Sequence, residues 1–339
     1  MQEAMLWHRE RNGIRCDLCA RRCFIPKGKK GFCLVRINKD NKLYTLNYGK
    51  LVAVNVDPIE KKPLFHFYPG SRALSIASAG CNFRCQFCCN AEISQALTLE
   101  KTGEVPGEEY TPEEIIKLAE KNKCRSISYT YTEPTIFYEF AFKTAKLAHR
   151  SNIMNTFVTN GYITPEALKK FKRLDAATVD FKASGDPEFY KKFMSVPDVS
   201  PIYETLKQMK KQRIFIEITN LIVPQVGDSV EQCRKLAEWI NEELGSDIPF
   251  HILQFHPSYN LLELPPTPVS TLEKCIEEAR RAGLRYVYIG NVPGHPDENT
   301  YCYNCREPLI LREGFFVRKI NLVNNRCPKC GFRINVITE

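Results

Sequence analysis

Between residues 72 and 290, short apolar segments alternate with amphipathic stretches, and this alternation restricts the fold more than any other feature of the chain. Strands are expected at 73–79, 126–132, 153–159, 176–182, 214–222, 250–255 and 285–290. The stretches between them have helical periodicity, and several follow a Thr or Ser suited to an N-cap. Repeated β–α units predict a parallel sheet covered by helices. A dinucleotide-binding glycine fingerprint is missing, which disfavours a doubly wound sheet. We therefore expect an α/β fold of the open, partial (β/α) barrel type, in which the loops after the strands carry the chemistry.

Two cysteine-bearing segments flank this region. Residues 1–50 are expected to form an N-terminal metal-binding lobe, 51–298 the barrel, and 299–339 a small C-terminal lobe. The proline-containing stretch 56–71 is expected to be an irregular connector. Since the last expected strand ends at the face that carries the chemistry, the C-terminal lobe is predicted to lie beside the active-site mouth and contribute to substrate binding.

This 339-residue chain has fifteen cysteines, and the redox state of its compartment decides whether they form disulfides or bind metals. The N-terminal residues show no apolar export signal, and no stretch of about 18 apolar residues occurs, so a cytoplasmic protein without a membrane span is expected. Thiols in a reducing compartment favour metal binding over disulfides. Isolated cysteines at 124, 233 and 275 are expected to be buried. Metal-bound thiolates would offset much of the formal charge of +9, which is therefore weak evidence for a polyanionic partner.

The central cysteine group directly follows the first expected barrel strand. Cys81, Cys85 and Cys88 have the spacing C-x3-C-x2-C. Three thiolates from one loop can hold three irons of a [4Fe–4S] cluster and leave the fourth iron open. A zinc knuckle or a redox pair is less favoured, because a structural zinc site needs a fourth ligand. Phe87 lies between the second and third ligands, and Cys89 is surplus and is expected to be a buried thiol.

The two flanking cysteine groups are expected to bind metals that stabilise the terminal lobes, since such short segments have little hydrophobic core of their own. Two C-x2-C pairs separated by 21 residues have zinc-ribbon spacing, with a rubredoxin-type iron or an auxiliary cluster as alternatives. This group consists of Cys302, Cys305, Cys327 and Cys330. The N-terminal group has irregular spacing, for which zinc or an auxiliary iron–sulfur cluster is expected. It consists of Cys16, Cys19, Cys23 and Cys33.

The segment "CNFRCQFC" (81–88) resembles the signature of radical S-adenosylmethionine (radical SAM) enzymes, in which SAM chelates the open iron through its amine and carboxylate. "YTEP" (131–134) resembles the G-G-E-P element of that family, although Tyr and Thr replace the two glycines. The resemblance places Glu133 near the SAM amino group. "VTNG" (158–161), with Thr159 and Asn160, resembles the T-N-G turn after the third strand.

Two further elements resemble the activating-enzyme branch of the same family. "VDFK" (179–182) resembles its D-x-K element, which implies that Lys182 pairs with the SAM carboxylate beside Asp180. "QFHP" (254–257) places His256 near the SAM ribose. Each residue alone also fits a structural role: Glu133 a helix-terminal acid, Asp180 and Lys182 an exposed ion pair, and His256 a core histidine. Their common position at strand ends favours a SAM site.

Nearly the whole chain resembles the AmmeMemoRadiSam system radical SAM enzymes, which are similar to pyruvate formate-lyase activating enzyme. The supporting stretches include "DPIEKKPLFHF", "IVPQVGDS" and "HPSYNLLELPPTP". The resemblance implies a (β/α)6-type barrel, a [4Fe–4S] cluster, SAM, and an electron donor such as a ferredoxin or flavodoxin. Reductive cleavage of SAM would then yield a 5′-deoxyadenosyl radical that abstracts hydrogen from an unidentified small-molecule, protein or RNA substrate.

Two alternatives remain from the sequence. A compact activating enzyme for glycyl-radical enzymes is one. The larger type of activator carries a ferredoxin-like insert with two clusters, and this type is excluded because residues 90–132 contain only Cys124. A zinc-dependent nucleic-acid-binding or scaffold protein is the other, and it leaves the central cysteine loop unexplained.

Overall fold

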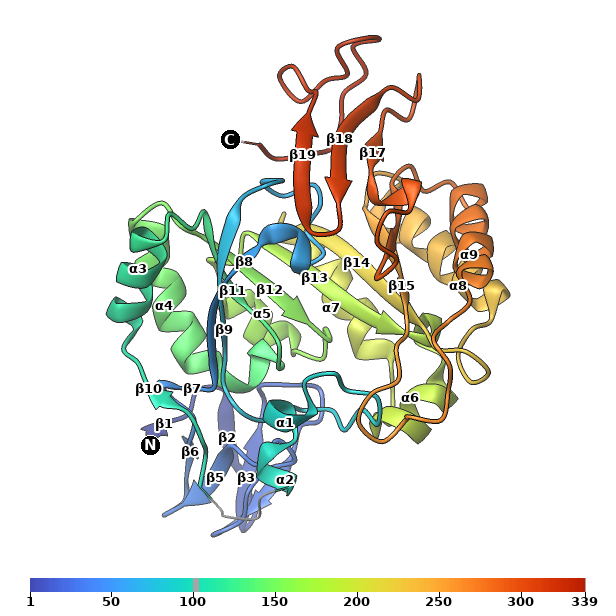
Figure 1. The fold of residues 1–339 in the computed structure, drawn as a ribbon. Helices are drawn as coiled ribbons and strands as arrows, with labels where there is room; N and C mark the ends of the chain where they lie inside the picture. The colour runs from blue at the N-terminus through green and yellow to red at the C-terminus, as the bar shows by residue number, and fades with distance from the viewer. Residues whose placement is uncertain (100–103, 339) are drawn as a thin grey trace.

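The computed structural model describes residues 1–99 and 104–338, and an eight-stranded sheet forms its centre (Figure 1). The sheet order follows the chain, so each strand pairs with the next one in sequence within it. The parallel strands are β9 (Arg72–Ala77), β11 (Ser126–Tyr129), β12 (Met154–Thr159), β13 (Ala176–Lys182), β14 (Phe215–Ile222), β15 (Phe250–Gln254) and β16 (Val287–Gly290). All seven expected strands are confirmed. The sheet stays open, as predicted, with β9 and β16 far apart in the strand order.

One edge strand was not predicted. β8 (Ala53–Pro58) pairs antiparallel with β9, and it extends into the stretch 56–71 that was expected to be irregular. Val54 and Val56 pair with Ile76 and Leu74, so two β-branched residues continue the sheet up to the proline. The prediction of an irregular connector is therefore wrong for its first residues.

Helices between the strands cover the sheet. They are α3 (Pro112–Lys121), α4 (Tyr138–Arg150), α5 (Pro165–Lys170), α6 (Pro187–Met194), α7 (Ser200–Lys211), α8 (Val230–Trp239) and α9 (Val269–Arg281). Short helices α1 (Ala91–Ser94) and α2 (Ala96–Leu99) follow the central cysteine loop, η2 (Pro134–Phe137) precedes α4, and the five-residue π-helix η4 (Ile240–Leu244) follows α8. Thr111 and Glu114 form a capping box at the start of α3, as the N-cap pattern predicts. No described helix is long and apolar enough to cross a membrane.

Small antiparallel sheets form the two ends of the chain. Near the N-terminus, one sheet contains β1 (Gln2–Glu3), β6 (Lys42–Thr45) and β5 (Arg36–Lys39), and another contains β2 (Trp7–Glu10), β3 (Gly13–Cys16) and β4 (Phe24–Pro26). Near the C-terminus, β17 (Thr300–Tyr301), β18 (Pro308–Glu313) and β19 (Phe316–Ile320) form a third. β7 (Lys50–Leu51) pairs with β10 (Glu108–Glu109). These two end regions lie on opposite sides of the central sheet (Figure 1).

The C-terminal lobe packs where strands β14–β16 begin. Tyr288, the second residue of β16, contacts Thr300 through their hydroxyl groups at 2.8 Å. Arg312 of β18 donates to the Phe65 carbonyl at 2.8 Å, and Glu217 near the start of β14 accepts the Phe65 amide at 3.0 Å. The central cysteine loop follows the opposite, carboxyl-terminal end of β9. The prediction that this lobe lies beside the active-site mouth is therefore wrong.

The chain between β16 and β17 explains that error, because it runs back along α9. His295 contacts Glu273 in the first half of α9 at 3.4 Å, and Asp297 then pairs with Arg280 near the helix end at 2.5 Å. Since α9 runs antiparallel to β16, this return carries the chain from the end of the strand to its beginning. Gly294, at φ +84°, supplies the left-handed turn that starts the return.

Candidate metal centre and active site

Cys81, Cys85 and Cys88 lie on the loop between β9 and α1, at the carboxyl-terminal edge of the sheet. The amide of Arg84 donates to the Met194 carbonyl at 3.0 Å, and the amide of Gln86 donates to the Phe193 carbonyl at 2.9 Å. The end of α6 therefore fixes the backbone between the first and third cysteines.

The environment of these thiols suits metal binding. All three are half-buried, and burial, followed by the nearby Glu133 carboxylate, raises the pKa of Cys81 to about 12. Burial also raises the pKa of Cys85, with the Cys88 thiol as the next cause. Such thiols stay protonated unless a metal cation replaces the proton. Three half-buried thiols on one constrained loop fit the three-thiolate set of an open [4Fe–4S] cluster.

The cysteines outside the three groups differ in burial. Cys124, Cys233 and Cys275 are buried, as predicted. Cys89 is exposed, so the expectation of a buried thiol is wrong for this residue. It directly follows the last cysteine of the loop and lies two residues before α1.

Glu133, Thr159 and Asn160 form one hydrogen-bonded network. The buried Glu133 carboxylate accepts from the Thr159 hydroxyl at 2.8 Å, the Asn160 amide at 2.8 Å and the Thr135 amide at 3.0 Å. Burial raises the pKa of Glu133, and these hydrogen bonds oppose the increase. The Asn160 side chain donates to Asn82 at 2.7 Å. The network therefore reaches the residue that follows Cys81.

The turn before Glu133 has an unexpected anchor. Tyr131 adopts φ +61°, a left-handed conformation that favours glycine. It occupies the position of the first glycine in the G-G-E-P element that this segment resembles. Its hydroxyl donates to Asp57, which also accepts from Lys62 at 2.7 Å. The Tyr131 carbonyl accepts from Asn90 at 2.9 Å. The sequence analysis missed this arrangement, whose only local signal is a basic residue close after Asp57.

The Asp180 and Lys182 side chains lie together at the end of β13. The Lys182 ammonium is 3.4 Å from the Asp180 carboxylate, and Thr219 of the adjacent strand donates to the same carboxylate. Both groups are close enough to Cys85 to act on it electrostatically. Lys182 is thus a partly exposed cation beside the cysteine loop.

Phe87 and His256 complete the residues singled out from the sequence. Phe87 is buried, and its ring lies 5.6 Å from that of Phe189 and 6.5 Å from that of Phe255. His256 follows β15 and is exposed. The structure therefore joins Glu133, Thr159 and Asn160 directly and pairs Asp180 with Lys182.

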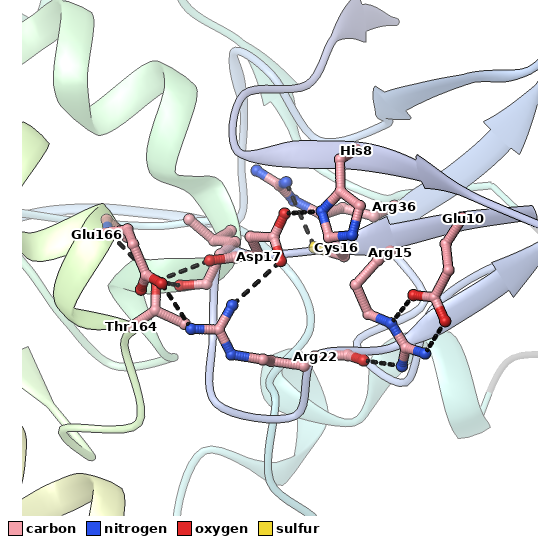
Figure 2. Close-up of polar contacts among 11 residues, drawn as sticks. His8, Glu10, Arg15, Cys16, Asp17, Arg22, Arg36, Thr164 and Glu166 are labelled. Atoms are coloured by element: carbon pink, nitrogen blue, oxygen red, sulfur yellow. Dashed lines mark hydrogen bonds and ion pairs between the residues drawn. The ribbon is translucent and has the colours of Figure 1, made fainter.

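The N-terminal lobe docks on this same edge of the sheet. Arg22 lies between Asp17 of the lobe and Glu166 of α5, at 3.1 Å and 2.8 Å (Figure 2). Thr164 donates to the Asp17 carbonyl at 2.7 Å. Cys19 forms a β-bridge with Ile163. One cavity is lined by all four N-terminal cysteines, Cys16, Cys19, Cys23 and Cys33.

The C-terminal cysteines form a compact tetrad. The sulfur atoms of Cys302, Cys305, Cys327 and Cys330 all lie within 4.8 Å of one another. Tetrahedral Zn²⁺ with Zn–S bonds of about 2.3 Å requires sulfur separations of about 3.8 Å, so these residues fit a structural zinc site.

Comparison with known proteins gives the family. Residues 75–240 match the radical SAM superfamily. An uncharacterized protein of Methanocaldococcus jannaschii is 45% identical over 340 residues, covering 99% of this chain and 100% of the relative. Pyruvate formate-lyase-activating enzyme of Clostridium pasteurianum is 28% identical over 195 residues, covering 55% of this chain and 77% of the relative.

A solved structure supports the fold. A radical SAM methyltransferase from Sphaerobacter thermophilus has a TM-score of 0.51 at 14% identity, with 66% of this chain and 68% of that chain covered. This chain belongs to the radical SAM superfamily and is a radical SAM enzyme. Membership implies a [4Fe–4S] cluster and SAM, which the residues at the carboxyl-terminal edge of the sheet fit.

Proposed function

We propose that this protein cleaves SAM reductively at a [4Fe–4S] cluster held by Cys81, Cys85 and Cys88, and abstracts hydrogen from a substrate still to be identified. The observation that carries the proposal is the convergence of the constrained cysteine loop with two polar groups at neighbouring strand ends. When bound, the cluster supplies one electron to SAM, whose C5′–S bond breaks to give methionine and a 5′-deoxyadenosyl radical.

The chain's own residues would position SAM and keep water away. Lys182 is placed to donate to a carboxylate, and charged hydrogen bonds of this kind are the strong ones. Glu133 holds Thr159 and the Asn160 amide in place, and would offer its remaining acceptor capacity to an ammonium group. Phe87 shields the loop with an aromatic cluster. His256 is exposed and available for the ribose of the cofactor.

The same proposal extends to the flanking parts. We assign 1–50 and 299–339 as metal-stabilised lobes around the barrel of residues 51–298, with zinc at the C-terminal tetrad. A ferredoxin or flavodoxin would supply electrons, and the oxygen-sensitive chemistry suits the reducing cytoplasm.

A compact activator of a glycyl-radical enzyme is the second candidate. The similarity to the activating enzyme of Clostridium pasteurianum favours it. In that case the substrate would be a backbone glycine of a partner protein. A zinc-dependent nucleic-acid-binding scaffold gains no support from the cysteine loop and its neighbouring network.

Anaerobic reconstitution tests the proposal. The protein is loaded with iron and sulfide, reduced with dithionite and mixed with SAM, and 5′-deoxyadenosine is quantified by mass spectrometry. We expect product from the parent and from Cys124→Ala, but none from Cys85→Ala. Cys124 is a buried thiol just before β11, whereas the cysteine loop follows the carboxyl-terminal end of the parallel strand β9. Product formation by Cys85→Ala equal to the parent would contradict the assignment.

A further inference from the structure

The N-terminal cysteines line a cavity that also contacts the central cysteine loop. The cavity lined by Cys16, Cys19, Cys23 and Cys33 is also lined by Asn82 and Thr135. Asn82 follows Cys81 in the loop, and Thr135 donates to Glu133. The N-terminal site therefore lies between the lobe and the edge of the sheet that carries the active site.

The backbones of the two cysteine groups are in contact. Gly80, immediately before Cys81, has φ +103°, and a Cβ atom there would lie 3.2 Å from the carbonyl oxygen of Cys33. The Arg84 guanidinium donates to the Cys81 carbonyl at 2.9 Å and to the Phe32 carbonyl at 2.5 Å. One side chain thus connects the residue before Cys33 to the first cysteine of the loop.

Two buried N–H donors at this cavity lack partners among the described residues. They are the side-chain amide nitrogen of Asn82 and the Nε of Arg36, in residues that are 0% and 1% exposed. Both residues line the cavity, and another nitrogen of Arg36 lies 3.6 Å from the Cys16 sulfur. Unsatisfied buried donors are costly, whereas N–H groups facing metal-bound sulfur stabilise its negative charge. The cavity is therefore suited to an anionic, sulfur-rich group.

The arrangement of the thiols indicates which group this is. The C-terminal sulfurs all lie within 4.8 Å of one another, whereas the N-terminal cysteines form no such compact set in the described structure. A single zinc ion draws its four sulfurs close together, but an iron–sulfur cluster binds each thiolate at a different iron. The wider N-terminal set fits the cluster better.

We propose that Cys16, Cys19, Cys23 and Cys33 hold a second iron–sulfur cluster that passes electrons to the cluster at Cys81, Cys85 and Cys88. An external ferredoxin or flavodoxin would be oxidised by one electron, the N-terminal cluster reduced and reoxidised, and the catalytic cluster reduced, with no bond or proton transferred. The inference rests on the proposed function only for the second half of this path.

Metal content tests the first half. After anaerobic reconstitution, the parent should hold about eight irons per chain if both sites carry four-iron clusters. The Cys19→Ala/Cys33→Ala variant and the Cys81→Ala/Cys85→Ala/Cys88→Ala variant should each retain about four, with matching sulfide. Zinc without sulfide in the triple variant would overturn the inference. Full iron content in the triple variant would instead overturn the proposed function, so the two failures are distinguishable.

Reduction kinetics test the relay. With reduced flavodoxin as donor, Cys19→Ala/Cys33→Ala should cleave SAM at least about tenfold more slowly than the parent, while the dithionite-driven rate stays within about twofold. Equal flavodoxin-driven rates in the variant and the parent would contradict the relay. Cys124→Ala should match the parent with both reductants.

A milder substitution keeps the inference testable if the double variant does not fold. Arg36→Lys keeps a cation beside Glu139 but removes the unpartnered Nε. This variant should retain all iron, and the midpoint potential of its N-terminal cluster should be lower than in the parent. The potential is measured by redox titration monitored with electron paramagnetic resonance. An unchanged midpoint potential in Arg36→Lys would overturn the placement of a cluster in this cavity.

Discussion

The buried ion pair between Arg36 and Glu139 should control how firmly the N-terminal lobe is attached. Both side chains are 1% exposed, and Arg36 of β5 donates to the Glu139 carboxylate in α4. The Met5 amide donates to the same carboxylate at 2.7 Å, and the Met5 carbonyl accepts from Arg36 at 2.9 Å. Glu139→Gln keeps the shape of the side chain but leaves the guanidinium charge without its buried partner. Breaking such a pair costs about 3–5 kcal/mol.

Native-state hydrogen exchange measures this cost where it acts. The free energy of opening for amides of β3 and β5 should fall by about 3–5 kcal/mol in Glu139→Gln. The matched control is Glu166→Gln, which removes the exposed partner of Arg22 and should cost at most about 1 kcal/mol. If both variants lose the same small amount, the buried pair does not anchor the lobe and the reasoning is refuted.

Three further predictions concern single side chains. Cys85→Ala should lose the visible absorption of the cluster, whereas Cys89→Ala, which changes an exposed thiol, should keep it; the reverse pattern in reconstituted protein would show that the ligands are misassigned. Lys182→Ala should keep its iron but bind SAM at least about tenfold more weakly, because a charged hydrogen bond contributes about 1.5–3 kcal/mol; unchanged affinity in equilibrium binding would exclude this contact. Burial raises the pKa of Glu60 to about 7, and Arg312 opposes this increase. The folded state therefore binds the Glu60 proton more tightly than the unfolded state does. The stability gained from this protonation is present at low pH and is lost as the pH rises through about 7. Glu60→Gln should therefore be more stable than the parent at pH 8, by up to about 3 kcal/mol, and similar to it near pH 4, whereas a pH-independent difference in urea unfolding would contradict this.

The barrel strands could be predicted because each buried strand is a short apolar run bounded by polar residues. The periodicity of the stretches between the strands predicted helices there, but it did not predict where α6 packs. In α6, Phe189 packs on Phe87, and the Phe193 and Met194 carbonyls hold the cysteine loop. This helix therefore owes its position to a loop about a hundred residues earlier in the chain, which local periodicity does not encode.

The candidate site could be predicted where its residues belong to compact motifs. Cysteine spacing and strand-end position identify single residues, but they do not reveal contacts between distant segments. Asn82 shows the difference, because its neighbours Asn160 and Arg21 come from the turn after β12 and from the N-terminal lobe. Tyr131 likewise holds its left-handed turn through Asp57, a residue of the unpredicted strand β8.

The opposite placement of the two lobes also separates their roles. The C-terminal lobe completes a buried polar network at the beginning of the strands. His66 contacts the Asn335 carbonyl at 2.6 Å and the Tyr288 hydroxyl at 2.5 Å, while Arg312 holds the Phe65 carbonyl. Truncation after Thr300 would remove Arg312 and Asn335 and leave these buried groups without their partners, which is destabilising. Loss of turnover in such a truncated chain would therefore report on the stability of the barrel, whereas the N-terminal lobe is the one whose changes can reach the chemistry directly.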